Sequence, residues 1–330
     1  MKAAYIERTG PPENIIYGDL PQPEPEGAQV LVRVGAAAVN PVDTYVRSGM
    51  TEFELPMPFI VGCDLAGKVV DVGPDVTRFK VGDRVWGTNQ GLLGRQGACA
   101  EYAAVDQCWL YPTPENISNE EAAAVALVGI TAHLGTFHHA NLQSRETVFV
   151  SGGTGGVGSC VVQMSRAIGA RVITTAGSVE KLKSCLAMGA SKAINYKTSD
   201  LDAAIRKFAP DGVDLWWGTL REYDLHQAVS HLALGGRIVI MAGRESTPEL
   251  PIEPFYLKNC SILGFAMFNA TAEEQRKCAA EINRWMGLGR LRANIDRVMP
   301  LYDAAAAHKL QEDNTLHNAG TLAGKIILTP

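Results

Sequence analysis

Short apolar runs separated by glycine and proline fill the first third of the chain. Within 28–39, 67–73, 82–87 and 101–105, β-branched and other apolar residues recur with polar residues between them. Runs of this kind, bounded by turn residues, are typical of strands in a small sheet. The pattern therefore predicts a compact, barrel-like β unit at the start of the chain.

The pattern changes near Asn119. Residues 120–140 are typical of helix, and from Thr147 strand-like runs alternate with helical segments, the strand-like runs being 147–152, 170–176, 192–196, 213–218 and 236–243. Such alternation predicts βαβ units and a parallel sheet. A long helical stretch at 272–289 follows, and the apolar run at 323–329 is expected to form a strand that returns to the first unit.

Composition narrows the class of protein. With 330 residues, of which 46% are hydrophobic and 20% charged, the chain can form two cores. The net charge of −5 and the scattered Lys and Arg residues give no basic surface, so we expect no nucleic-acid partner. Lys2, Glu7 and Arg8 interrupt the N-terminus, which does not resemble a signal peptide, and no run is long enough for a membrane span. Seven cysteines without a CxxC pair indicate reduced thiols. We therefore expect a cytoplasmic protein.

A glycine-rich turn joins the strand-like run that begins at Thr147 to a helix-like run. It fits the pattern GxGxxG and reads Gly153-Thr154-Gly155-Gly156-Val157-Gly158. Glycines permit a tight turn and a close approach of the backbone to a pyrophosphate, whose charge the helix N-terminus stabilises. The alternative is a flexible turn without a ligand. Because a second strand follows at the expected interval, we predict that all six residues bind a dinucleotide.

The end of the second strand decides which dinucleotide is expected. An NAD site usually places Asp or Glu there, to accept hydrogen bonds from the ribose 2′-hydroxyl. This chain has Thr175-Ala176-Gly177-Ser178 instead. Ser178 can donate a hydrogen bond and Lys181 can supply a cation to a 2′-phosphate, so the sequence predicts NADPH. In the alternative, Lys181 is a solvated surface lysine and the neighbouring Glu180 weakens the positive field.

Several sequence blocks, in the same order along the chain, resemble one family. They are VNPVDTYVRSG at 39–49, PFIVGCDLAGKVVDVG at 58–73, VGDRVWG at 81–87, SGGTGGVG at 151–158 and AGKIIL at 323–328. Together they resemble the zeta-crystallin and quinone oxidoreductase branch of the zinc-free medium-chain dehydrogenase/reductases. The likeness extends over nearly the whole chain.

The resemblance implies an α/β fold with two domains. A GroES-like, β-rich substrate domain would be formed by 1–122 and 269–330. A Rossmann domain, with a doubly wound parallel sheet that binds NADPH, would occupy 123–268. An active cleft would lie at the junction of the domains. Family members commonly form dimers or tetramers through their Rossmann sheets, so we expect a homodimer or homotetramer.

The resemblance also implies that zinc is absent. Zinc-bearing relatives have Cys in place of Asn40, a His-Glu pair in place of Cys63 and Asp64, and a second Cys near Leu127 or Val128. One thiol and one carboxylate do not supply the three protein ligands of a catalytic zinc. Without this Lewis acid, reduction of an electrophilic conjugated system is easier than oxidation of an alcohol. The expected reaction is direct hydride transfer from NADPH to a quinone or another small conjugated carbonyl.

The resemblance places Asn40 and Thr131 at the active site, and Tyr45 and Tyr196 are expected there as well. Asn40 would donate a hydrogen bond to the acceptor carbonyl, unless it only forms an Asx turn before Pro41. Tyr45 would line the pocket or donate a proton, unless it only packs. Thr131 would contact the nicotinamide, unless it bonds its own helix backbone. Tyr196 is expected to contact the cofactor.

Other pairs of residues have simpler interpretations. Asp43 and Arg47 lie four residues apart and are expected to form an ion pair on one helix. His138 and His139 are expected to be a surface pair. The tryptophans at 216 and 217 either crowd the cofactor or pack within the domain, and the sequence does not distinguish these possibilities.

Two other functions remain open from the sequence. One is reduction of the double bond of an alkenal, enone or enoyl thioester, although a thioester carrier would need a basic patch that the sequence does not show. The other is a non-catalytic role as an NADPH-binding, crystallin-like or RNA-associated protein. The acidic balance of the chain disfavours RNA.

Overall fold

The computed structural model describes residues 1–317 and 319–330, which form two units. Unit 1 comprises Met1–Leu127, Thr271–Gly287 and Arg292–Pro330, and unit 2 comprises Val128–Ala270 and Leu288–Leu291. The sequence-based boundaries were near residues 122 and 268, with all of 269–330 in the first domain, whereas Leu288–Leu291 groups with unit 2. In the described part of the chain, no helix has both the length and the apolar character needed to cross a bilayer.

Unit 1 is built around a seven-stranded sheet. Its strands, in spatial order, are β15 (Ile295–Pro300), β16 (Lys325–Thr329), β3 (Gln29–Val39), β5 (Asp64–Val72), β6 (Arg84–Gly87) and β8 (Leu110–Pro112), and β7 (Tyr102–Asp106) also pairs with β3. A three-stranded sheet has the order β2 (Ile16–Asp19), β1 (Lys2–Ile6) and β4 (Phe59–Ile60). The helices are α1 (Pro41–Ser48), the first part of α2 (Asn119–His133), α8 (Ala272–Gly287) and α9 (Ala304–Leu316).

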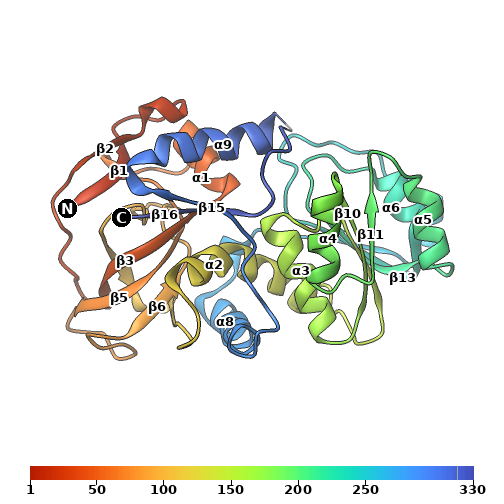
Figure 1. Ribbon diagram of the computed structural model, residues 1–330, viewed down its shortest axis with the longest axis horizontal. Coiled ribbons are helices and arrows are strands. Elements are labelled where there is room, and N and C mark those ends of the chain that lie inside the picture. The colour runs from red at the N-terminus through yellow and green to blue at the C-terminus, as the bar shows by residue number, and fades with distance from the viewer. Residues whose placement is uncertain (318) are drawn as a thin grey trace. The chain divides into compact units, whose positions relative to one another are not determined.

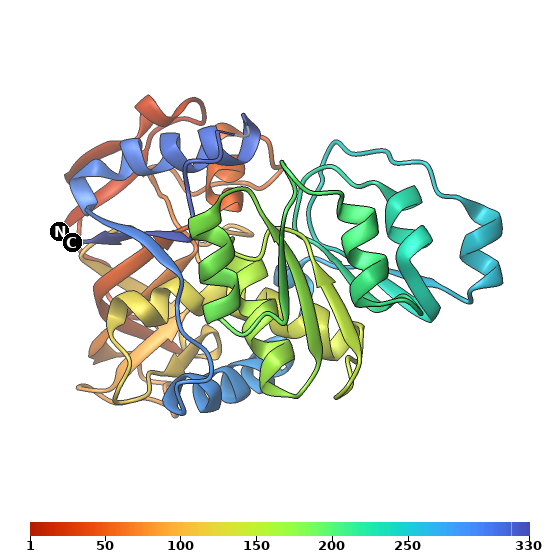
Figure 2. The same cartoon turned by 45° about the vertical axis from the view of Figure 1, so that its right-hand side comes forward.

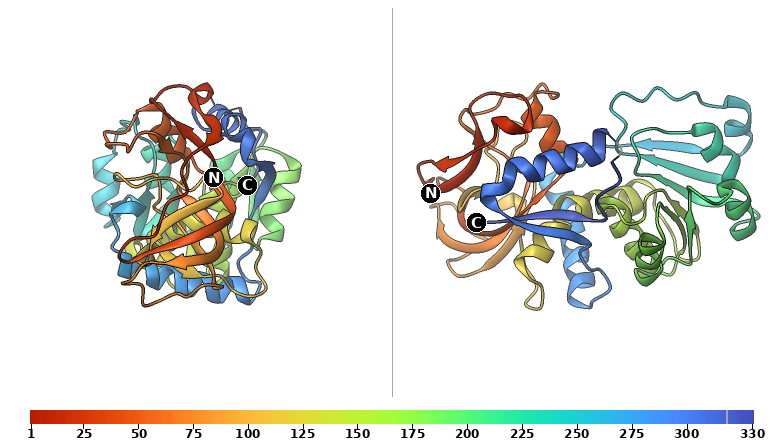
Figure 3. Two further views of the ribbon diagram at one scale, coloured as in Figure 1. Left: turned by 90° about the vertical axis from the view of Figure 1, so that its left-hand side faces the viewer. Right: turned by 45° about the horizontal axis from the view of Figure 1, so that its top comes forward.

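The last strand of the chain lies in the first unit, as the sequence predicted. β16 pairs antiparallel with β3, with Ile326 opposite Val39 and Leu328 opposite Ala37. Figure 3 shows both chain ends in this unit, with β16 next to β15. The core between the strands is formed by valines and leucines of β3, β5 and β6, because alternate positions of each strand face inward. The C-terminal residues are therefore integral to the first unit.

Unit 2 contains a six-stranded parallel sheet. Its strands, in spatial order, are β11 (Lys192–Asn195), β10 (Arg171–Ala176), β9 (Thr147–Val150), β12 (Val213–Gly218), β13 (Leu232–Ile240) and β14 (Ser261–Gly264). A π-helix (Leu134–His139) continues α2, and the remaining helices are α3 (Gly156–Ala167), α4 (Val179–Ala187), α5 (Leu201–Phe208), α6 (Leu225–His231) and α7 (Ile252–Leu257). This strand order is that of the Rossmann fold, so the predicted α/β fold class is confirmed.

One predicted helix is shorter than expected. The helical segment expected between the strand-like runs 213–218 and 236–243 ends early, because α6 ends at His231 and Leu232 already pairs with Val213 as the start of β13. Gly235 has a φ of 74°, a left-handed conformation that a helix does not accommodate. The strand therefore begins earlier than the apolar pattern indicated.

The two tryptophans of β12 pack on opposite faces of the sheet. Trp216 stacks on Phe149 with ring centroids 3.9 Å apart, in the core that α5, α6 and α7 cover. Trp217 is fully buried and donates a hydrogen bond of 2.9 Å to Thr136 Oγ1 in the π-helix. Figure 2 shows α3 and α4, in green, on the other side of the sheet from the blue-green helices α5 to α7. Both tryptophans therefore have packing roles, which answers the question left open by the sequence.

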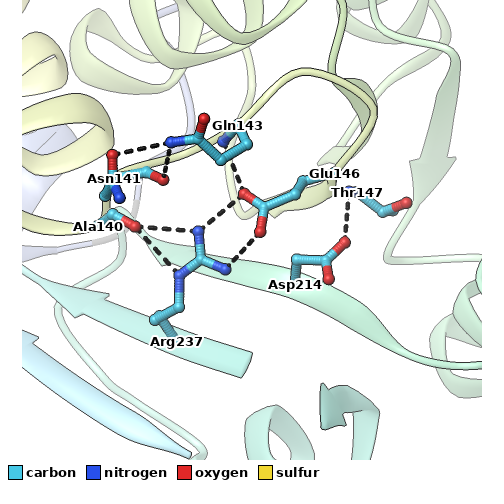
Figure 4. A network of polar contacts seen from close by, with 7 residues as sticks. All are labelled: Ala140, Asn141, Gln143, Glu146, Thr147, Asp214 and Arg237. Atoms are coloured by element: carbon cyan, nitrogen blue, oxygen red, sulfur yellow. Dashed lines mark hydrogen bonds and ion pairs between the residues drawn. The ribbon is translucent and has the colours of Figure 1, made fainter. Parts of the chain in front are cut away.

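A polar network closes the edge of this sheet where the parallel strands begin (Figure 4). Arg237 in β13 forms two hydrogen bonds of 2.8 Å with the carboxylate of Glu146, and its Nε donates to the carbonyl of Ala140 at 3.1 Å. Burial alone would raise the pKa of Glu146, but the hydrogen bonds from Arg237 and from the Gln143 amide have a larger effect. The pKa of Glu146 is therefore below its usual value. Asp214 accepts a hydrogen bond from the amide of Thr147 at 2.7 Å. The network fixes the chain between the π-helix and β9.

Candidate functional site

The predicted phosphate-binding turn lies at the opposite edge of the parallel sheet, where β9 ends. Three hydroxyl-bearing residues from neighbouring strands and loops hold it in place. Thr175 Oγ1 accepts a hydrogen bond from the amide of Gly152 at 3.1 Å, and Ser151 Oγ accepts one from the amide of Thr219 at 2.9 Å. Thr174 Oγ1 donates to the carbonyl of Val150 at 2.6 Å. Since β9 is flanked by β10 and β12, the turn occupies the point at which the strand order reverses, where α/β sheets bind ligands.

The glycines of this turn meet two different requirements. A Cβ on Gly153 would overlap Thr174 Oγ1, and one on Gly158 would overlap the carbonyl oxygen of Gly152, so the fold itself excludes side chains there. Gly155 is exposed, and a Cβ there would meet only the Gly152 carbonyl oxygen, at 3.3 Å. Gly155 is the N-cap of α3, whose first-turn N–H groups have no intrahelical partner. The open backbone at this helix N-terminus fits the diphosphate of a dinucleotide.

The end of β10 carries polar and cationic groups. Ser178 is the N-cap of α4, and its Oγ accepts a hydrogen bond from the amide of Lys181 at 3.3 Å. The pKa of Glu180 is lowered by a hydrogen bond from its own amide and by one from the Ser178 hydroxyl. The Ser178 hydroxyl that was predicted to face a phosphate is therefore shared with a carboxylate in this structure.

Tyr196 and Lys197, which directly follow β11, lie over the turn after β10. A Cβ on Gly177 would be 2.8 Å from Tyr196 Oη and 3.2 Å from Lys197 Cε. Tyr196, which the sequence predicted at the cofactor, is thus brought to the same edge of the sheet as Gly153–Gly158, Ser178 and Lys181. Lys197 was not predicted. The sequence could have indicated Lys197 as well, because β10 and β11 are parallel neighbours and the residues after them meet at one edge of the sheet.

Thr131 lies in α2 and is 5% exposed, so its side chain is buried.

The histidines 138 and 139 are exposed at the end of the π-helix, with ring centroids 4.8 Å apart, and His139 also packs against Phe265. Their contacts are those of a surface pair.

In unit 1, Asn40 joins the end of β3 to α1. Asn40 and Asp43 form a capping box at the start of α1, in which the backbone N–H of Asn40 donates to Asp43 Oδ2 at 2.7 Å. The Asn40 side chain is fully buried, and its Nδ2 donates to Asp64 Oδ2 at 2.8 Å and to the Ala38 carbonyl at 3.3 Å. Its Oδ1 accepts a hydrogen bond from Lys325 Nζ. The side-chain amide of Asn40 therefore has hydrogen-bond partners within the protein, and a hydrogen bond from it to a substrate carbonyl would replace one of these contacts.

The groups around Asn40 form a buried polar cluster from four segments of the chain. Lys325 Nζ donates to the Val39 carbonyl at 2.7 Å and lies 4.0 Å from Asp64 Oδ2, and Asp64 Oδ1 accepts from the Leu127 amide at 3.1 Å. Burial raises the pKa of Asp43 to about 6, and it also raises the pKa of Asp64. We call Asn40, Asp43, Asp64 and Lys325 the buried cluster.

The buried cluster does not fit a catalytic zinc. The buried Cys63 thiol is hydrogen-bonded to Asp43, so it already has a partner within the protein. Asp64 is already bonded to Asn40 and lies next to the Lys325 ammonium. Within the residues that the structure describes, no group of three His, Cys, Asp or Glu side chains is arranged to hold a metal. We therefore derive no catalytic step through zinc.

Tyr45 is half-buried on α1, and its sequence neighbours Thr44 and Val46 are buried. The predicted ion pair between Asp43 and Arg47 is wrong. Asp43 accepts hydrogen bonds at the helix cap instead, and the buried Arg47 pairs with Glu312 of α9 and donates to the Gly10 carbonyl. Figure 1 shows α1 and α9 side by side, which explains why Arg47 finds its partner on the other helix.

Comparisons with known proteins agree with this architecture. Two family models match the chain, the alcohol dehydrogenase GroES-like domain over residues 26–115 and the zinc-binding dehydrogenase over residues 156–284. The quinone oxidoreductase of Homo sapiens is 34% identical over 330 residues, which cover 99% of this chain and 97% of that protein. The chain belongs to the quinone oxidoreductase branch of the medium-chain dehydrogenase/reductase family. As a family member it is an oxidoreductase, and the predicted resemblance is confirmed. Asn40, Cys63 and Asp64 lie outside the match to the zinc-binding model.

Further relatives differ in substrate and cofactor. The 2-methylene-furan-3-one reductase of Solanum lycopersicum is 30% identical over 314 residues, covering 93% of this chain and 73% of that protein. A solved structure of an NAD-dependent alcohol dehydrogenase has a TM-score of 0.87 and 31% identity, with full coverage of both chains. A mycobacterial protein solved in complex with NADPH has a TM-score of 0.86 and 28% identity, also with full coverage. The family is therefore clear, whereas its members differ in the substrates and cofactors that their names give.

Proposed function

We propose that this oxidoreductase uses NADPH to reduce a quinone, or another small conjugated carbonyl, by direct hydride transfer without zinc. The observation that carries the proposal is the buried cluster. In the positions where zinc-bearing members of the family have metal ligands, this chain has Asn40, Cys63 and Asp64, and its own Lys325 ammonium lies among them. An ammonium at this place would repel a metal cation.

The residues of unit 2 would bind the cofactor. The bound dihydronicotinamide supplies the hydride. The backbone from Gly153 to Gly158 and the N-terminus of α3 would hold the diphosphate, because a helix N-terminus favours negative charge. Ser178, Lys181 and Tyr196 would surround the 2′-phosphate, and we add Lys197 because its side chain lies over Gly177. Thr131 and Val157 keep their predicted roles as cofactor contacts.

The residues of unit 1 would act on the acceptor. Hydride addition to a conjugated carbonyl leaves an anion that needs one proton, and the Tyr45 hydroxyl would donate it. Asn40 would fix the start of the helix that carries Tyr45, and would donate to the acceptor oxygen when it releases Ala38 or Asp64. One hydride and one proton complete a two-electron reduction of the acceptor.

The tomato 2-methylene-furan-3-one reductase among the relatives favours an enone as the second candidate substrate.

We also propose that two copies of the chain pair through β14, since this edge strand pairs within unit 2 only with β13. Sedimentation at several concentrations tests that pairing, and a chain that sediments as a monomer throughout contradicts it.

The function is tested by following NADPH oxidation with phenanthrenequinone and with a 2-alkenal, beside a fluorescence titration with NADPH and NADH. The proposal expects tighter binding of NADPH and turnover with the quinone. Turnover with the alkenal alone assigns the second candidate. Tight NADPH binding without turnover on either acceptor contradicts an enzymatic function and supports a crystallin-like role.

A further inference from the structure

The ammonium of Lys325 is buried in unit 1, with 4% of the residue exposed. Lysines are rarely buried to this degree unless they are paired. Lys325 begins β16, which pairs with β3, and this pairing brings it to Asn40 across 285 residues of sequence. It donates to the Val39 carbonyl and to Asn40 Oδ1, and Asp64 supplies the opposite charge at 4.0 Å.

These contacts permit only one orientation of the Asn40 amide. Its oxygen faces the ammonium, and its nitrogen faces three acceptors, which are Asp64 Oδ2 at 2.8 Å, the Ala38 carbonyl at 3.3 Å and Asp43 Oδ2 at 3.4 Å. Rotating the amide by half a turn would place N–H donors against an ammonium and the amide oxygen against a carboxylate. Both contacts would be repulsive in a site from which water is excluded. The Lys325 ammonium on the oxygen side and the carboxylates on the nitrogen side together set the direction of the Asn40 N–H groups.

We propose that Lys325 is a positioning residue, which orients the Asn40 amide and thereby the start of the helix that carries Tyr45. This inference rests on the proposed function, since it assumes that Asn40 and Tyr45 act on the acceptor. It assigns a role in the reaction to the last strand of the chain. The ammonium lies beside Asn40 and Asp64, at whose positions zinc-bearing members of the family have other residues.

The test compares Lys325→Met with Lys325→Arg, and uses Lys309→Met as the matched control. Lys309 is an exposed lysine of α9 in the same unit. We expect Lys325→Met to lower kcat by about tenfold or more with little change in KM for NADPH, because the cofactor residues are untouched. Lys325→Arg should recover most of this loss, because guanidinium keeps the charge and the donors. Lys309→Met should match the wild type.

The second readout is hydrogen exchange of the Asn40 side-chain amide, followed by NMR. Protection should be lost in Lys325→Met, while the Trp86 indole, which donates to Asn283 in the same unit, stays protected. This measurement needs no substrate. If the wild type proves inactive on every acceptor, the proposed function fails, and the exchange result still decides whether Lys325 orients Asn40.

Lys325→Met leaves Asp64 buried without its cation, which can prevent folding. The double variant Asp64→Asn/Lys325→Met removes both charges and serves as the second test. If Lys325 orients the amide, the double variant folds but keeps the low kcat and the unprotected amide. Wild-type kcat and protection in the double variant would show that Lys325 only balances the charge of Asp64, and the inference would be overturned. Wild-type kcat in a folded Lys325→Met would overturn it as well.

Discussion

Replacing Lys181 and Lys197 by alanine, singly and together, tests how the protein selects NADPH. Both lysines belong to the edge of the parallel sheet where β10 and β11 end, and Lys197 lies over Gly177. A 2′-phosphate carries a charge of about −1.5 to −2 near neutral pH, by analogy with other phosphate monoesters. NADH has only a hydroxyl at this position, so the same substitutions should hardly affect it.

The expected magnitude follows from charge and exposure. Two unit charges about 4 Å apart attract by ~1 kcal/mol in water and ~4 kcal/mol at an effective dielectric constant near 20. Because Lys181 is half-buried and Lys197 is exposed, we take a value near the lower limit, about 1.4 kcal/mol for each lysine. Each single variant should then lose roughly tenfold in kcat/KM for NADPH, and the double variant roughly a hundredfold if the effects are independent.

The assay is steady-state kinetics with both cofactors at a saturating quinone concentration. The loss should come mainly through KM, since the adenosine end of the cofactor is remote from the hydride. Lys192→Ala is the matched control, because Lys192 is exposed at the other end of β11. Equal losses with NADPH and NADH, or a wild type that prefers NADH, would refute the assignment of these lysines to the phosphate.

Three further predictions concern single residues of unit 2. Gly156→Asp puts a negative charge into the first turn of α3, so NADPH affinity in a titration should fall by at least about tenfold with an unchanged melting temperature; unchanged affinity would mean that this turn is not the phosphate site. Glu180→Gln removes the carboxylate bonded to the Ser178 hydroxyl, so NADPH should bind roughly twofold to fivefold more tightly, and weaker binding would contradict the predicted phosphate contact. Arg237→Met should lower the free energy of unfolding by roughly 2–3 kcal/mol at neutral pH, measured in urea. The folded-state pKa of Glu146 lies below its usual 4.5, so this difference should be constant above that value and shrink as the pH falls further, and a difference that grows in acid would refute the role of the pair.

The features that the sequence revealed are local along the chain. The GxGxxG turn, the missing carboxylate after β10 and the alternation of strands and helices depend on neighbouring residues, and the structure places the turn and the end of β10 at one edge of the sheet. Ser178 was predicted from the end of the second strand, and the parallel pairing of β10 with β11 explains why Tyr196 lies at the same edge. The same argument reaches Lys197, which directly follows Tyr196.

The contacts that the sequence did not reveal join distant segments. Asp43 and Arg47 have the spacing of a helical ion pair, but the cap takes the carboxylate and Arg47 meets Glu312, 265 residues away. Likewise, Asn40 is 24 residues from Asp64 and 285 from Lys325. No periodicity connects such positions. The pairing of β3 with β5 brings Asp64 to Asn40, and the pairing of β16 with β3 brings Lys325 there. The packing of Trp216 and Trp217 also became clear only with their partners, Phe149 and Thr136.

The central claim, hydride transfer from NADPH without zinc, is tested most directly by turnover of the metal-stripped protein with and without added Zn²⁺. Metal content is measured in the same sample by elemental analysis. Because Asn40, Cys63, Asp64 and Lys325 do not form a zinc site, the stripped protein should reduce phenanthrenequinone with NADPH at the rate of the untreated protein, and Zn²⁺ should add nothing. Stoichiometric zinc in the purified protein, together with activity that returns only when zinc is restored, would contradict the account.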